Sequence, residues 1–447
     1  MVSKAVALTL ACCLFSSGAS DKSKTSNDPV FQQLDHIVKT LSGITGLEQK
    51  RAVPYGRMNK RQLHQFLAKR MKSSMKPDEV HADELSLKLF GLVPTDFDLK
   101  QSTLDLLTEQ AAAFYDYQEK KLFLLDTSSF TEEEITLAHE LSHALVDQHF
   151  DMSKFMEEGP TNDDENLAHS AVVEGQATWL MMAYQLKQSG AEPVPTPDML
   201  KQVTEGSDSN NALYPVLSAS PLYIQRSLLF PYVEGTLFFD AVYRKLGKES
   251  FAAVFKDPPV DSSQIIHPDR YFAHIAATKP ALPAWKLDGS SKKVTEGDMG
   301  EFDYTILVTV FADKEKAAHL APHLRGSQYR ILEMGKEKRP VLEYIAEWDT
   351  PEHAKEYLAV YKQVLQGKWK ACEFLTGTET ELGGRGDIGY FTTRLEGAYV
   401  TSLEGIRDKE EWARISKDPP ANAPPAKQTA PKEAAPDTAK AVPAAKS

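Results

Sequence analysis

Apolar positions in the first 290 residues recur mainly with the spacing of amphipathic helices. One clear case is a stripe at i, i+3, i+4 and i+8, formed by Leu63, Phe66, Leu67 and Met71. Residues 113–117 and 121–125 are instead short runs of aromatic and aliphatic side chains, separated by the polar residues 118–120. The pattern predicts a mostly helical region that contains one β-hairpin.

The segment after this hairpin has a well-marked helix start. Thr131 and Glu134 have the spacing of a capping box, and Phe130 can pack on Ile135 across the first turn. Negative side chains at 132–134 suit the positive end of the helix dipole. An apolar stripe follows, made by Ile135, Ala138, Leu141 and Leu145. We therefore expect a helix from Thr131 that packs one face on the core.

The pattern changes after residue 300. Residues 304–311 are rich in β-branched side chains and predict a strand, with a buried helix as the alternative; residues 341–346 predict a second strand. Thr350 and Pro351 then begin a helix. Its buried face is formed by Ala354, Tyr357, Leu358, Tyr361, Val364 and Leu365. This part is expected to be a smaller α+β domain, in which we assign chemistry to no residue cluster.

Length and composition divide the chain. At 447 residues it exceeds what one hydrophobic core usually holds. The exposed, polar residues 288–293 are typical of a linker, and residues 418–447 are mainly Pro, Ala and Lys, which predicts a disordered tail. The expected fold class is α+β, with a helical domain and small sheet in 20–290 and an α+β domain in 298–415.

The first nineteen residues have the layout of a secretory signal peptide. Lys4 precedes an apolar run, and Ser17, Gly18 and Ala19 offer small residues for cleavage. A buried N-terminal helix is the alternative. We expect a secreted or periplasmic protein; lipid attachment at Cys12 is less favoured because residues 9–11 fit that signal poorly. Cys372 alone then remains, so no internal disulfide is expected and this residue should be a small buried hydrophobe.

Charge excludes one class of partner. The formal net charge is −12, and no basic stripe offsets it, so nucleic acid is not expected to bind. No later stretch is long and apolar enough to cross a bilayer. We therefore expect no transmembrane segment.

The chemistry is concentrated in residues His139 to His143, which read His-Glu-Leu-Ser-His. Two histidines four apart on a helix lie one turn above each other, so both imidazoles can reach one ion. Glu140 lies beside that face, where it can take a proton from water activated by Zn²⁺. Two solvated helix histidines are the alternative.

Two residues compete to be the third zinc ligand. Glu174 lies in an apolar helical segment, where an unpaired carboxylate is costly, and Gly175 beside it should allow this helix to pack closely on the first. His149 would instead match the HExxHxxGxxH pattern, but Val146 stands where that pattern needs glycine. We favour Glu174. Asp147 either orients an imidazole or is an exposed helix acid.

Together these residues resemble a known family. The runs 139–150 and 173–178, with weaker likeness at 91–94, 113–116, 230–235 and 258–271, resemble bacterial secreted HExxH–Glu, gluzincin-like metallopeptidases. The resemblance implies a zincin-like fold, zinc held by His139, His143 and Glu174, and Glu140 as general base. Gluzincins also have a downstream His or Tyr that stabilises the oxyanion. Spacing does not place it here, and the candidates are His267, Tyr271 and Tyr232.

The expected function is hydrolysis of peptide bonds in a peptide or protein substrate. Residues 113–115 could hold an extended substrate, which would add to the hairpin as a further strand. One alternative is a non-catalytic, zinc-binding scaffold or binding protein of the cell envelope. A structural zinc site has four protein ligands, whereas the sequence offers three, which favours catalysis. Hydrolysis of a non-peptide amide or ester would use the same site.

Overall fold

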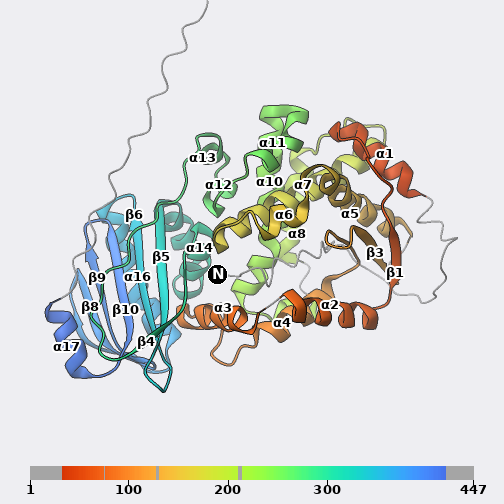
Figure 1. Ribbon diagram of the computed structural model, residues 1–447. Coiled ribbons are helices and arrows are strands. Elements are labelled where there is room, and N and C mark those ends of the chain that lie inside the picture. The colour runs from red at the N-terminus through yellow and green to blue at the C-terminus, as the bar shows by residue number, and fades with distance from the viewer. Residues whose placement is uncertain (1–32, 75, 127–129, 210–213, 419–447) are drawn as a thin grey trace, which may run out of the picture.

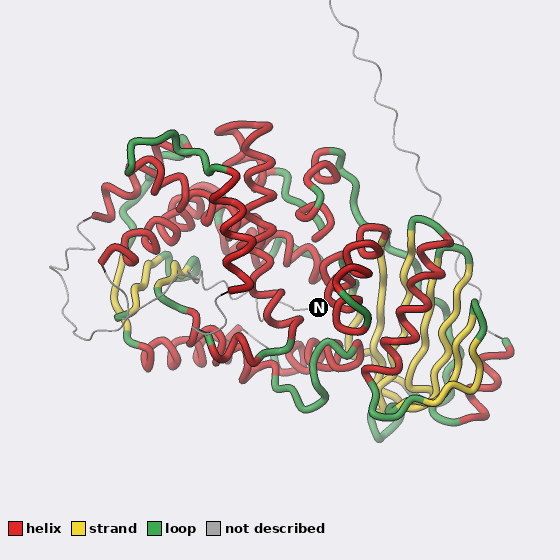
Figure 2. The backbone as a smooth tube through the Cα atoms, turned by 180° about the vertical axis from the view of Figure 1, so that it is seen from behind, coloured by secondary structure: helices red, strands yellow, loops and turns green. Residues whose placement is uncertain are grey.

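The computed structural model describes residues 33–74, 76–126, 130–209 and 214–418. The predicted signal peptide and most of the predicted tail lie outside these residues. The chain forms a helical part with a small sheet, and beside it a large antiparallel sheet with its own helices (Figures 1 and 2). It therefore has the mixed α and β content expected for the α+β class.

Helices dominate the first part. The predicted stripe at 63–71 lies on α2, where Leu63, Leu67 and Met71 are buried. The helices are α1 (Leu34–Thr45), α2 (Lys60–Ser74), α3 (Pro77–Phe90), α4 (Leu99–Gln110), α5 (Phe130–Phe150), α6 (Met152–Glu157), α7 (Asp163–Gln188), α8 (Pro197–Ser209), α9 (Pro215–Ala219), α10 (Leu222–Leu246), the 3-10 turn η2 (Gly247–Glu249), α11 (Ser250–Lys256), α12 (Ser262–Ile266) and α13 (Pro268–Phe272).

The predicted hairpin is present and belongs to a three-stranded sheet. Strands β2 (Ala113–Asp116) and β3 (Lys121–Leu125) pair antiparallel, and β1 (Tyr55–Met58) pairs parallel with β3, so β2 is an edge strand. All four residues of β2 are buried. Helix α5 begins at Phe130, one residue before the predicted cap. The side chains of Phe130 and Thr131 lie outside the described residues, whereas Glu134, the other member of the predicted capping box, accepts from the Tyr184 hydroxyl at 2.7 Å.

The second part is built on a seven-stranded sheet in the order β4-β5-β6-β10-β9-β8-β7. On β6, Leu342, Tyr344 and Ala346 face the core that α16 shares, whereas Val341 faces a cluster with Trp412 of α17. The elements are β4 (Ser291–Gly297), α14 (Glu301–Phe311), α15 (Lys314–Leu320), η3 (Ala321–His323), β5 (Leu324–Met334), β6 (Arg339–Trp348), α16 (Pro351–Lys368), β7 (Glu373–Gly377), β8 (Glu381–Gly386), β9 (Gly389–Glu396), β10 (Tyr399–Ile406) and α17 (Lys409–Lys417).

Four local predictions need comment here. The helix after Thr350 is confirmed as α16: the Thr350 side chain accepts from the His353 N–H, and every residue of the predicted face is buried. The strand expected at 304–311 is wrong and the alternative, a helix, is confirmed, because these residues form helix α14. The linker expected at 288–293 is also wrong in part, since Ser291 begins β4, which pairs with β5. Cys372 is half-buried rather than buried.

Candidate metal centre

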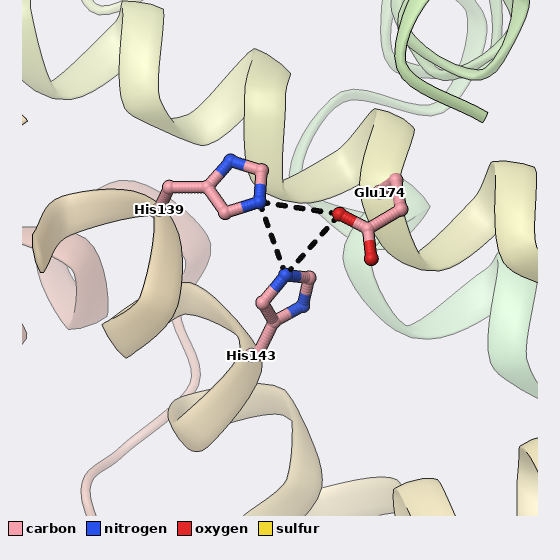
Figure 3. A group of neighbouring side chains, drawn as sticks. All are labelled: His139, His143 and Glu174. Atoms are coloured by element: carbon pink, nitrogen blue, oxygen red, sulfur yellow. Dashed lines mark hydrogen bonds and ion pairs between the residues drawn. The ribbon is translucent and has the colours of Figure 1, made fainter. Parts of the chain in front are cut away.

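The three predicted ligands converge at one point between α5 and α7 (Figure 3). Nε2 of His139 lies 3.1 Å from Nε2 of His143 and 3.2 Å from Oε2 of Glu174. The distance from Nε2 of His143 to the same oxygen is 3.5 Å. Side chains spaced four apart on α5 thus meet a carboxylate supplied by a different helix.

The site is deeply buried. His139, His143 and Glu174 expose 1%, 5% and 2% of their surface, and Glu140 exposes none. Within the described part of the chain, Oε1 of Glu140 and Oε1 of Glu174 have no hydrogen-bond partner. Two carboxylates buried this way are costly unless a positive charge balances them. The donor set, two imidazoles and a carboxylate, therefore fits a divalent ion such as zinc.

The ionisation of the site agrees with this fit. Burial lowers the pKa of His139, and its hydrogen bond to Glu174 offsets the effect only in part. Burial alone would raise the pKa of Glu174, but the charge of His143 and the hydrogen bond to His139 lower it to about 2. A neutral His139 imidazole beside an ionised Glu174 carboxylate follows, and each of these two groups binds metal in that state.

Glu140 lies next to the triad and is held by the hairpin. Its Oε2 accepts a hydrogen bond of 2.8 Å from the backbone N–H of Tyr115 on β2. Burial, and then the nearby Glu174 carboxylate, raise the pKa of Glu140 well above its usual value, although the Tyr115 N–H opposes the shift. A positive charge at the triad is therefore what would keep Glu140 ionised as a base.

The sequence did not reveal how Tyr115 fixes the hairpin on α5. Its hydroxyl donates to Oδ2 of Asp147 at 2.8 Å, while Oδ1 of Asp147 accepts from Lys120 and from the Met152 N–H. Asp147 is thus buried and supports Tyr115; among the described contacts it meets no imidazole, and it is not an exposed helix acid. In the sequence, the position of Asp147 one helical turn beyond His143 was the feature that could have indicated a supporting role.

His149 lies outside the triad. Helix α5 continues past Val146 to Phe150, so His149 faces elsewhere, and its Nε2 lies 2.8 Å from the Glu48 carbonyl. Gly175 was expected to let α7 approach α5, and this is wrong. A Cβ at Gly175 would lie 2.1 Å from the carbonyl carbon of Gly235, so the close approach is between α7 and α10.

The structure gives different surroundings to the three residues that could stabilise an oxyanion. Nε2 of His267 lies 2.7 Å from a carboxylate oxygen of Glu301, and the Tyr271 hydroxyl donates to the Asp257 carbonyl at 2.8 Å. The half-buried Tyr232 of α10 instead stacks beside His139, with 6.2 Å between ring centroids. Of the three, Tyr232 is the one whose ring lies beside a triad residue among the described ring pairs.

Comparison with known proteins adds no family to this picture: no family model matches the chain, and no curated protein or solved structure matches it either. None of the described helices combines the length and apolar character that crossing a bilayer requires.

Proposed function

We propose that the protein is a zinc-dependent hydrolase of the metallopeptidase type, with zinc held by His139, His143 and Glu174. The single observation that carries the proposal is the convergence of these buried side chains, with Glu140 beside them on the helix of the two histidines. When bound, zinc supplies a Lewis acid that polarises a carbonyl and makes water acidic enough to be activated near neutral pH.

The protein's own groups then have distinct tasks. Glu140 takes a proton from the attacking water and delivers it to the leaving nitrogen, and the Tyr115 N–H holds its carboxylate in place. Tyr232 is our candidate to donate to a developing oxyanion, because its ring lies beside that of His139, with 6.2 Å between centroids. A substrate that binds along the edge strand β2 could not use the Tyr115 N–H, because this group must stay bonded to Glu140.

A second candidate is a non-catalytic zinc-binding protein of the cell envelope. What favours it is the burial of the site, whose least covered ligand, His143, exposes only 5% of its surface. A substrate carbonyl must reach the ion for hydrolysis, whereas a structural ion needs no access.

Glu140→Gln separates the two candidates. The amide keeps the shape of the side chain and removes no metal ligand, so zinc content and fold should be unchanged. Turnover of a broad peptide library should fall by about 10²–10⁴-fold or more, because the general base is lost. Glu134→Gln, on the same helix but bonded to Tyr184, is the matched control and should keep activity. Equal activity in Glu140→Gln would remove Glu140 from the mechanism, and a zinc-loaded but inactive wild type would favour the binding protein.

A further inference from the structure

A second cluster of metal-binding side chains lies in the part of the chain built on the large sheet. His319 is in α15, His323 ends η3, Asp349 follows β6, and His353 is in the first turn of α16. Segments about 30 residues apart thus meet at one surface. None of these residues touches the triad at His139, His143 and Glu174 among the described contacts.

The cluster is already assembled by specific hydrogen bonds. Nδ1 of His323 lies 2.7 Å from one carboxylate oxygen of Asp349, and Nδ1 of His353 lies 2.6 Å from the other. The two imidazole rings stack with 3.6 Å between centroids. The Asp349 N–H also donates to the His323 carbonyl at 3.0 Å, which joins the two segments through the backbone.

We propose that His323, Asp349 and His353 form a second metal site, which binds a divalent transition-metal ion such as Zn²⁺, Ni²⁺ or Cu²⁺. One atom of each residue lies within 4.8 Å of the others. Two imidazoles and a carboxylate are a ligand set that these ions prefer, whereas Mg²⁺ and Ca²⁺ prefer oxygen ligands alone. An ion bound to these nitrogens would displace the Nδ1 protons that the imidazoles share with Asp349, and each neutral imidazole would carry its proton on Nε2 instead.

The surroundings supply the room and the further ligands that such an ion needs. The side chains of His323 and Asp349 expose 35% and 36% of their surface, so the carboxylate can move aside by the small distance that metal bonds require. The His319 ring centroid lies 6.0 Å from that of His323 and 5.9 Å from that of His353. A turn of this exposed side chain would bring a third imidazole to the ion, and water would complete the coordination.

Zinc analysis of the full chain after removal of free metal tests the site. Wild type should retain two equivalents of zinc, and His323→Gln/His353→Gln should retain one. His139→Gln/His143→Gln should also retain one, because it removes the other site. His64→Gln/His81→Gln removes two exposed histidines outside both clusters and should retain two. Circular dichroism without metal checks that each variant is folded.

Titration with Ni²⁺ in the His139→Gln/His143→Gln background isolates the proposed site. Further change of His323 or His353 to Gln should raise the dissociation constant at least about tenfold, since even supporting residues of metal sites are worth that much. The proposal is overturned if the background variant binds no metal. It is equally overturned if His323→Gln/His353→Gln still holds two equivalents of zinc. Because the background lacks the triad, failure here leaves the proposed hydrolase untouched.

Discussion

Glu174 is the residue on which the choice of zinc architecture depends. Its carboxylate lies within 3.5 Å of both triad imidazoles, whereas His149 is bonded to a backbone carbonyl. Glu174→Ala should therefore weaken zinc binding by more than the about 10–100-fold that supporting residues contribute. His149→Ala should retain zinc. Competition with a chelator of known affinity measures both.

Glu174→Gln is the control for packing in this experiment. It fills the same buried space but carries no charge, so it should also lose zinc while the fold is kept. If His149→Ala released zinc and Glu174→Ala did not, the third ligand would be His149. The site would then have the architecture of the HExxHxxGxxH pattern.

Asp298 provides a pH-dependent test at the same scale. Together with Asp164 it lines a cavity of about 30 Å³, and Oδ1 of each has no partner among the described residues. Burial, with the negative charges of Asp163 and Asp303, raises the pKa of Asp298 to about 6 from its ordinary 3.8. The folded state thus binds this proton more tightly than the unfolded chain does.

The sign of the effect follows directly. Protonation of Asp298 favours the folded state, so its contribution rises as the pH falls through about 6 and is complete below about 3.8. Asp298→Asn mimics the protonated form and should raise the free energy of unfolding at pH 7.5 by about 1–3 kcal/mol. At pH 5 the gain should be smaller. Urea unfolding of both proteins at the two pH values measures it, and an equal gain at both would contradict the raised pKa.

At the scale of elements, the crossing of α7 and α10 positions Glu174, the proposed zinc ligand. A Cβ at Gly175 would lie 2.1 Å from backbone atoms of Gly235, and one at Gly235 would lie 2.2 Å from the Ala171 carbonyl oxygen. Backbone cannot yield as a side chain can, so the helices must separate. Gly175→Ala should lower the free energy of unfolding by about 3 kcal/mol or more. It should also weaken zinc binding, because Glu174 is the adjacent residue.

Gly43→Ala is the matched control. Gly43 is also a helical glycine, in α1, but a Cβ there meets nothing within 4 Å. The change should stabilise the protein by about 0.5–1 kcal/mol, the ordinary gain for alanine in a helix. Thermal or urea unfolding compares the two. A loss at Gly43 as large as at Gly175 would mean that close helix packing is not the cause.

Elements with a clear period were predicted well, and an element without one was not. The face of α16 repeats with helical spacing and begins at a Thr-Pro start, and both features are local. The less buried side of helix α14 carries Thr305, Thr309 and Val310 rather than charged residues, so residues 304–311 show no strongly polar face that would distinguish a helix from a strand. Its residue Asp303, which accepts from the Gly300 N–H, was the signal for a helix start.

The same contrast holds for the two proposed metal sites. His139 and His143 are four apart on one helix, so their meeting can be predicted locally, and Glu174 is conspicuous in an apolar segment. His323 and His353 meet only because η3 and α16 flank the same pair of strands, β5 and β6. No local spacing predicts that contact, which is why we assigned no chemistry to this part from sequence.

At the scale of the whole molecule, the two parts share one core. The Phe90 ring, at the end of α3, lies edge-on to Tyr329 and Tyr344 of the large sheet, with centroids 5.5 and 5.7 Å away. A buried ion pair lies close to this contact. Nζ of Lys368 is 2.6 Å from Oε2 of Glu404 and donates to the Leu89 carbonyl at 2.9 Å. Lys368 therefore joins α16, β10 and α3.

Lys368→Met tests how much this contact among α16, β10 and α3 contributes to stability. The Lys368 and Glu404 side chains expose 1% and 0% of their surface, so the change leaves a carboxylate buried without its cation. The free energy of unfolding should fall by about 3–5 kcal/mol, as expected when one partner of a buried pair is lost. Lys368→Met/Glu404→Gln should cost less than Lys368→Met alone, because the charge is removed and the amide can still accept from Tyr361.

An exposed ion pair on the same helix provides the comparison. Lys355 lies 2.6 Å from Glu379, but their side chains expose 56% and 81% of their surface, so Lys355→Met should change stability by at most about 0.5 kcal/mol. Urea unfolding is followed by circular dichroism and by tryptophan fluorescence. Because Lys368 also bonds to α3, Lys368→Met should make the unfolding transition followed by circular dichroism differ from the one followed by tryptophan fluorescence. In wild type and in Lys355→Met the two transitions should coincide. Coincident transitions and a small loss in Lys368→Met would mean that the apolar contact at Phe90 joins the parts without help from the ion pair.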